Sequence, residues 1–99
     1  MYYVERGDSP KLGIVTKDEN GNEITPSELP KCLIFLKTQL IDTLNVSGTV
    51  STYIAFWTVP SNAILSPPYY TAEWKWVYGA RNFVKRGMIY VYHTGVKEK

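Results

Sequence analysis

The chain has 99 residues, of which 44% are hydrophobic and 20% charged, a composition that excludes a disordered chain and suits one domain over residues 1–99. Its net charge of +2 is too small to indicate a nucleic-acid-binding protein. The single cysteine, Cys32, excludes an internal disulfide and a multi-cysteine zinc site.

Neither a secretory signal nor a membrane span is expected. The first six residues contain no long apolar run, and no segment approaches the roughly 18–20 apolar residues that cross a bilayer. Because Cys32 lies within the apolar stretch Cys32–Leu36, we expect a buried and unreactive thiol. These features predict a protein that is made, and kept or assembled, in a reducing cytoplasm.

The N-terminal part of the chain predicts strands joined by tight turns. A short strand is expected over Lys11–Thr16. The pair Asn20-Gly21 that follows predicts a hairpin with a type I′ turn, because both central residues of that turn need positive φ. Glu23–Thr25 then either begins the return strand or closes the turn.

Residues 25–44 fit either a helix or strands. A capping-box pattern with Pro26 at the first helical position, followed by leucines three and four residues apart, favours an amphipathic helix. Against it, Pro30 would lie inside that helix at a cost of about 3 kcal/mol, and the β-branched and aromatic residues favour strands. We expect a strand over Lys31–Lys37 and at most one helical turn near Pro26–Leu29.

The next segment predicts a turn and a long strand. Asn45–Gly48 has turn composition, and Thr49–Val59 is rich in β-forming residues up to Pro60. Ser61–Ser66 is compatible with one helical turn, and Pro67-Pro68 predicts an extended corner.

Residues 69–78 carry the clearest pattern in the chain. Large apolar residues occupy every second position: Tyr70, Ala72, Trp74, Trp76 and Tyr78. Since successive side chains of a strand point to opposite faces, this predicts a strand with an aromatic face in the core and with Glu73 facing solvent. Gly79–Gly87 is expected to turn the chain, and Met88–His93 to form the last strand. Short strands with turn signals about every ten residues predict an all-β sandwich or a small barrel.

No set of residues has the pattern of a catalytic or metal site. His93 is the only imidazole and has no second His or Cys at ligand spacing. Asp18, Glu19 and Glu23 flank the predicted hairpin turn, as solvated carboxylates do, and they lack the spacing of a calcium loop. We therefore expect no enzyme activity, no cofactor and no bound metal.

Aromatic and basic residues alternate over 74–86, as in oligonucleotide-binding barrels that stack bases on exposed rings. The two-residue spacing of Trp74 and Trp76 favours burial instead. A single-strand nucleic-acid binder and a carbohydrate-binding module therefore stay as the alternative functions.

Several tyrosines are expected on the surface. Tyr90 and Tyr92 alternate with Ile89 and Val91, so they point outward if the aliphatic residues are core. Exposed tyrosines are enriched in protein interfaces because an apolar ring carries one polar group. The candidates for contact with another protein are Tyr2, Tyr3, Tyr69, Tyr90 and Tyr92.

Six landmarks follow one another along the chain: Gly7–Leu12, Lys17–Ile24, Lys31–Lys37, Thr58–Ser61, Tyr70–Trp74 and Gly87–Val91. Their order resembles the immunoglobulin-like N-terminal domain of phage baseplate upper proteins and related structural modules of tailed phages. The resemblance implies an immunoglobulin-like antiparallel β-sandwich of about seven strands. It also places Tyr70, two residues before Ala72, where such folds often keep a corner tyrosine.

The resemblance further implies a non-enzymatic structural or adaptor role in a bacteriophage virion. Its expected partners are other virion proteins and copies of itself, without a membrane, and its assembly would take place in the bacterial host cytoplasm. Further domains follow the module in the baseplate proteins, whereas this sequence ends at Lys99. The expectation is therefore a free-standing component of the capsid, neck or tail.

Overall fold

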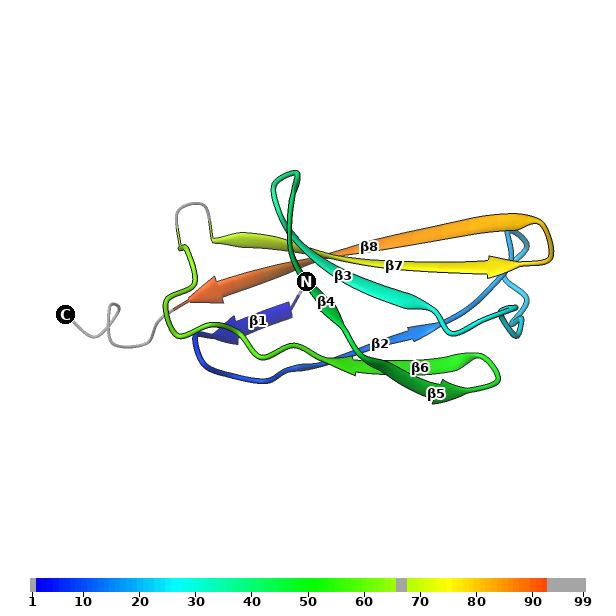
Figure 1. The fold of residues 1–99 in the computed structure, drawn as a ribbon, viewed down its shortest axis with the longest axis horizontal. Coiled ribbons are helices and arrows are strands. Elements are labelled where there is room, and N and C mark those ends of the chain that lie inside the picture. The colour runs from blue at the N-terminus through cyan, green and yellow to red at the C-terminus, as the bar shows by residue number, and fades with distance from the viewer. Residues whose placement is uncertain (1, 66–67, 93–99) are drawn as a thin grey trace.

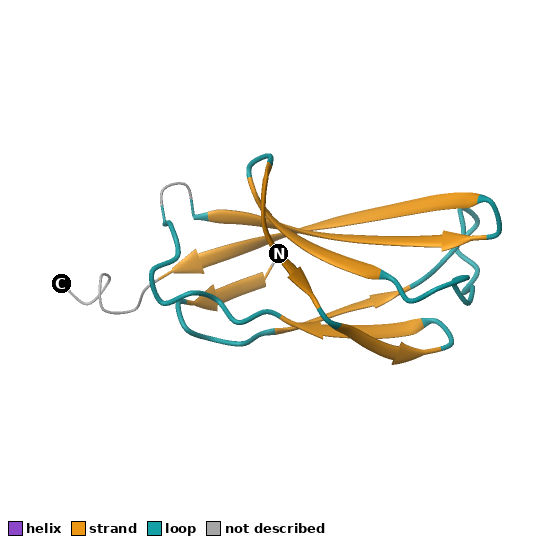
Figure 2. Ribbon diagram, in the orientation of Figure 1, coloured by secondary structure: helices purple, strands orange, loops and turns teal. Residues whose placement is uncertain are grey.

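A computed structural model of the chain describes residues 2–65 and 68–92. These residues form eight strands and no helix, in two packed sheets (Figures 1 and 2). The strands are β1 (Tyr2–Glu5), β2 (Lys11–Val15), β3 (Lys31–Leu36), β4 (Gln39–Leu44), β5 (Val46–Thr49), β6 (Thr52–Phe56), β7 (Tyr69–Tyr78) and β8 (Arg81–Tyr92). The predicted all-β sandwich is confirmed.

The two sheets have the strand order of an immunoglobulin-like sandwich. The larger sheet runs β1-β8-β7-β3-β4, and its strands β8-β7-β3-β4 match the order G-F-C-C′ of that fold. The smaller sheet, β2-β6-β5, matches the order B-E-D. All neighbouring strands are antiparallel except β1, which runs parallel to the end of β8 and aligns Tyr2 with Ile89 and Glu5 with Tyr92. Because β1 joins β8, no strand of the described residues lies beside β2 on the side away from β6.

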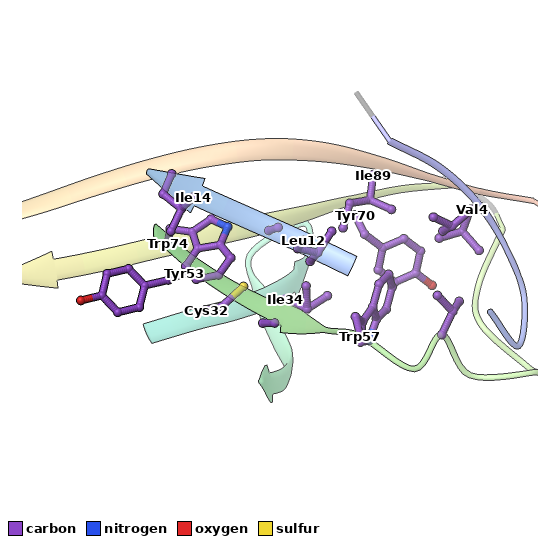
Figure 3. Close-up of a cluster of buried hydrophobic side chains, with 14 of the residues drawn as sticks. Val4, Leu12, Ile14, Cys32, Ile34, Tyr53, Trp57, Tyr70, Trp74 and Ile89 are labelled. Carbon is purple, nitrogen blue, oxygen red and sulfur yellow. The ribbon is translucent and has the colours of Figure 1, made fainter. Parts of the chain in front are cut away.

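The core lies between the sheets and is centred on β7. Tyr70, Ala72, Trp74 and Trp76 are between 2% and 7% exposed, which confirms the predicted inner face, whereas Tyr78 at the end of the strand is 46% exposed. The labelled core side chains in Figure 3 also include Leu12, Ile14, Cys32, Ile34, Trp57 and Ile89.

Tyr70 fastens the connection between β6 and β7. Its hydroxyl donates a hydrogen bond of 2.8 Å to the carbonyl oxygen of Ile64, six residues upstream. Its ring packs against Trp57, with the ring centroids 5.4 Å apart (Figure 3). This is the contact that a corner tyrosine makes in immunoglobulin-like folds. Ala72 occupies the position that the second core cysteine takes in antibody domains, and Cys32 is a free thiol.

The loop after β2 is not the type I′ turn that the sequence predicts. Only Gly21 has positive φ, 84°, while Asn20 does not. The loop is instead built on Asp18, whose carboxylate accepts the backbone N–H groups of Asn20 and Asn22 at 2.9 Å each. Glu23 closes the turn through a single bridge to Lys17 and begins no strand.

Between residues 25 and 52 the strand β3 agrees with the prediction, and residues 26–29 form no helical turn. The predicted turn at Asn45–Gly48 is wrong, because β5 runs through most of it. The chain turns later, at Val50, which adopts a left-handed φ of 60°. Gly48 lets β5 approach β6 closely: a Cβ atom there would lie 2.2 Å from the carbonyl oxygen of Thr52.

The predicted turn over Gly79–Gly87 is also wrong. Only Gly79 and Ala80 turn the chain, and β8 begins at Arg81 and pairs with β7 along that strand's whole length. A turn closed by the Ala63 N–H and the Pro60 carbonyl, at 3.1 Å, replaces the helical turn expected after Pro60. Ser66, Pro67 and His93, with the end of the predicted last strand, lie outside the described residues.

Candidate protein interface on the five-stranded sheet

The outer face of the larger sheet carries a row of tyrosines from three strands. Tyr69 of β7 aligns with Tyr90 of β8, and Tyr90 aligns with Tyr3 of β1. The ring centroids of Tyr69 and Tyr90 are 5.3 Å apart with an edge-on geometry, and those of Tyr3 and Tyr90 are 5.5 Å apart. We call Tyr3, Tyr69 and Tyr90 the tyrosine row. Tyr3 is 68% exposed and Tyr69 is 44% exposed.

The structure brings four of the five predicted interface tyrosines to this face. Tyr92 alternates with buried Val91, so it shares the face of Tyr90, and it is half-buried. Tyr2 is different, because it shares a face with buried Val4 and points toward the side of the sandwich, where it is 43% exposed. It therefore does not belong to the tyrosine row.

Sequence reasoning missed apolar residues next to the row. Met88 lies two residues before Tyr90 on β8 and is 42% exposed, and Leu40 of β4 is 48% exposed. Thr71 of β7 aligns with Met88 on one side and with Phe35 of β3 on the other. The outer face therefore exposes apolar side chains on several strands. Met88 lies in the predicted strand Met88–His93 and occupies every second position together with Tyr90 and Tyr92, so the period-two pattern of that strand could have indicated it.

Glu73 points to this outer face, as expected, but it is not solvated. It is only 6% exposed, because two basic side chains cover it. The Arg86 Nε atom lies 2.7 Å from one carboxylate oxygen, and the Lys75 Nζ atom lies 3.5 Å from the other. The prediction of a solvent-facing Glu73 is wrong, since these cations are long enough to lie over the carboxylate and replace water.

Other titratable groups have structural roles. Burial raises the pKa of the Cys32 thiol to about 12, in agreement with the expected unreactive cysteine. A hydrogen bond from the Arg81 guanidinium lowers the pKa of Glu19 and ties the loop after β2 to the turn between β7 and β8. The backbone N–H of Asn22 lowers the pKa of Asp18 in the same loop.

The tryptophans are enclosed. Trp74 is 5% exposed and Trp76 is 7% exposed, so the prediction that both rings face the core is confirmed. Trp76 stacks on Phe83 of β8, with centroids 5.8 Å apart and planes at 10°. Its Nε1 atom has no hydrogen-bond partner in the described structure. These rings contribute to the core and offer no stacking surface.

In residues 2–65 and 68–92, no three His, Cys, Asp or Glu side chains are grouped so that they could hold a metal ion. The same residues contain no helix with the length and apolarity needed to cross a membrane. Comparison with protein-family models, with curated proteins and with solved structures gives no match for this chain.

Proposed function

We propose that this chain is a non-enzymatic structural or adaptor protein of a bacteriophage virion, a component of the capsid, neck or tail that acts through protein–protein assembly. The resemblance to tailed-phage modules supports the virion role. The tyrosine row carries the assembly role, with other virion proteins and copies of the chain as partners.

The tyrosine row has the physical properties of an interface anchor. Tyr3 and Tyr69 expose large rings that gain free energy when a partner removes them from water. Both rings already rest against Tyr90, so little side-chain freedom is left to lose on binding. An interface built on them can form without reaction chemistry or a cofactor.

The two alternative functions have less support. A single-strand nucleic-acid binder would need accessible rings for base stacking, and both Trp74 and Trp76 are buried. A carbohydrate platform would need rings in a common plane. The Tyr3 and Tyr69 rings are inclined at 43° and 75° to Tyr90, so the row offers no flat surface to a sugar ring.

The test is incorporation into particles by a variant that carries Tyr3→Ser and Tyr69→Ser. Both side chains are exposed, so the variant should keep its fold, which its melting temperature checks. Quantitative mass spectrometry of purified virions should show a loss of about tenfold or more, equivalent to about 1.4 kcal/mol. The matched control is Tyr78→Ser, because Tyr78 is 46% exposed and lies at the other end of β7.

Equal incorporation of wild type, control and double variant would refute the role of the tyrosine row. Purified virions that lack the wild-type chain altogether would refute the virion role.

A further inference from the structure

Two strand edges without neighbours border one groove at the side of the sandwich. β1 pairs with only the last four of the twelve residues of β8, so the eight residues Arg81–Met88 have no partner on that side within the described chain. The edge of β2 away from β6 is equally free in the described structure. In Figure 1, β1 lies beside only the final part of β8. Free edges present unpaired N–H and C=O groups to which another strand can bind.

The groove between these edges has a volume of about 430 Å³. Its walls are β2 on one side and residues 85–87 of β8 on the other, and Ala72 and Trp74 of β7 contribute to its floor. We call it the edge groove. Its position is that of the strand that borders strand B in the B-E-D sheet of an immunoglobulin-like sandwich.

The floor of the edge groove is kept open by two small residues. Gly87 aligns with Ala72, and both lie on the inner face of the larger sheet. A Cβ atom built on Gly87 would meet no atom within 4 Å, so the space above it can take a side chain from outside. A glycine inside a strand weakens that strand and often marks a place where another backbone approaches closely.

The rim of the edge groove is basic. Lys17 and Lys85 are exposed, and neither side chain has an ion pair or hydrogen bond with any described residue. The uncovered stretch of β8 carries no acidic residue, and its basic residues are Arg81, Lys85 and Arg86. Because Arg81 is paired with Glu19 and Arg86 with Glu73, Lys85 supplies the unpaired positive charge of this stretch. Two copies that paired their free β8 edges would bring the two unpaired Lys85 side chains onto the same short ladder, and the repulsion between them is unfavourable. The charge therefore favours an acidic partner over a second copy of the chain.

We propose that the edge groove binds an extended acidic segment of another polypeptide, which adds as a strand to the free edge of β8 and places an apolar side chain over Gly87. Strand addition supplies backbone hydrogen bonds, and a pocket for one side chain supplies specificity. The edge groove lies at the side of the sandwich, whereas the tyrosine row lies on the outer face of the larger sheet. This inference therefore does not depend on the proposed virion role.

The probe is a capped, fluorescently labelled peptide of eight residues in which Glu and Val alternate, as long as the uncovered stretch of β8. Fluorescence anisotropy should show saturable binding that weakens as salt rises. Hydrogen exchange of the complex should be slowed at amides within residues 81–88, because a bound strand pairs with them. A peptide in which Lys replaces Glu should not bind.

Two variants test the geometry. Gly87→Val fills the open space at a position of ordinary φ, so the fold should persist while peptide affinity falls by about tenfold or more. Lys85→Glu should lower the affinity to a similar extent by reversing a rim charge. The matched control is Lys37→Glu, which makes the same charge change in the turn between β3 and β4 and should bind normally. Melting temperatures confirm that every variant is folded.

Wild-type affinity in Gly87→Val would overturn the inference, as would protection that falls outside residues 81–88. Dimerisation of the chain without peptide, if Gly87→Val abolished it, would assign the groove to a second copy and refute the acidic partner. If these peptide tests fail but the tyrosine variant is lost from particles, the edge-groove inference is refuted and the proposed virion role stands.

Discussion

Removal of the Tyr70 hydroxyl tests how firmly the connection between β6 and β7 is held. Tyr70→Phe deletes the 2.8 Å hydrogen bond to Ile64 but keeps the ring and its contact with Trp57. The net contribution of one intramolecular hydrogen bond to the free energy of unfolding is about 0.5–1.5 kcal/mol. Ile64 as a residue is 53% exposed and the hydrogen bond is partly buried, so solvent lies near the freed carbonyl group and limits the penalty. We expect a loss of about 1 kcal/mol, which lowers the melting temperature of a domain of this size by about 4–8 °C.

The change in the free energy of unfolding is measured by urea denaturation, with tryptophan fluorescence and far-UV circular dichroism as the two probes. The matched control is Tyr78→Phe, because the Tyr78 side chain is 46% exposed and its hydroxyl has no hydrogen bond with a described residue. The control should change stability by less than about 0.5 kcal/mol. If Tyr70→Phe is as stable as the control, the hydroxyl does not fasten the corner. A loss above about 3 kcal/mol would mean that the ring itself has moved, since one hydrogen bond cannot account for it.

Three further predictions concern single residues. The Cys32 thiol should react with Ellman's reagent only as fast as the chain unfolds, because it is fully buried with a pKa near 12, and rapid native labelling would contradict this. Gly48→Ala should cost about 1–3 kcal/mol in urea unfolding, whereas Gly87→Ala should cost nothing, since only the first places a Cβ atom against backbone. The lowered pKa of Asp18 stabilises the fold at pH values above its usual 3.8. Asp18→Asn should therefore melt below wild type at pH 7, with a gap that closes as the pH falls below 3.8 and the folded carboxylate becomes protonated; a constant gap would refute the assignment.

The sequence predicts the strands whose pattern reflects burial on one face. β7 has the predicted bounds, because alternating aromatic residues can be buried only by an extended chain between two sheets. β5 and the first part of β8, residues 81–87, are not predicted, because local composition misleads there. Asn45–Gly48 has the composition of a turn, but Gly48 lies within β5, where the absence of a side chain lets that strand pack close to β6. The true turn uses Val50, a residue type that rarely takes positive φ.

The candidate site could be predicted only as a set of residue types. Tyr90 and Tyr92 are predicted as surface residues from their alternation with Ile89 and Val91. The meeting of the tyrosines in one row depends on the register of β7 with β8 and on the parallel pairing of β1, which no local pattern contains. The burial of Glu73 likewise depends on Arg86, its cross-strand partner.

The parallel pairing of β1 with the end of β8 determines how the domain would carry tension. In Figure 1 both arrows point the same way. A pull that draws Tyr2 backward along its strand and Tyr92 forward along its own acts parallel to both. The backbone hydrogen bonds between the two strands are then sheared together instead of being unzipped one after another. A domain built in this way resists extension along that axis until the whole short ladder slides.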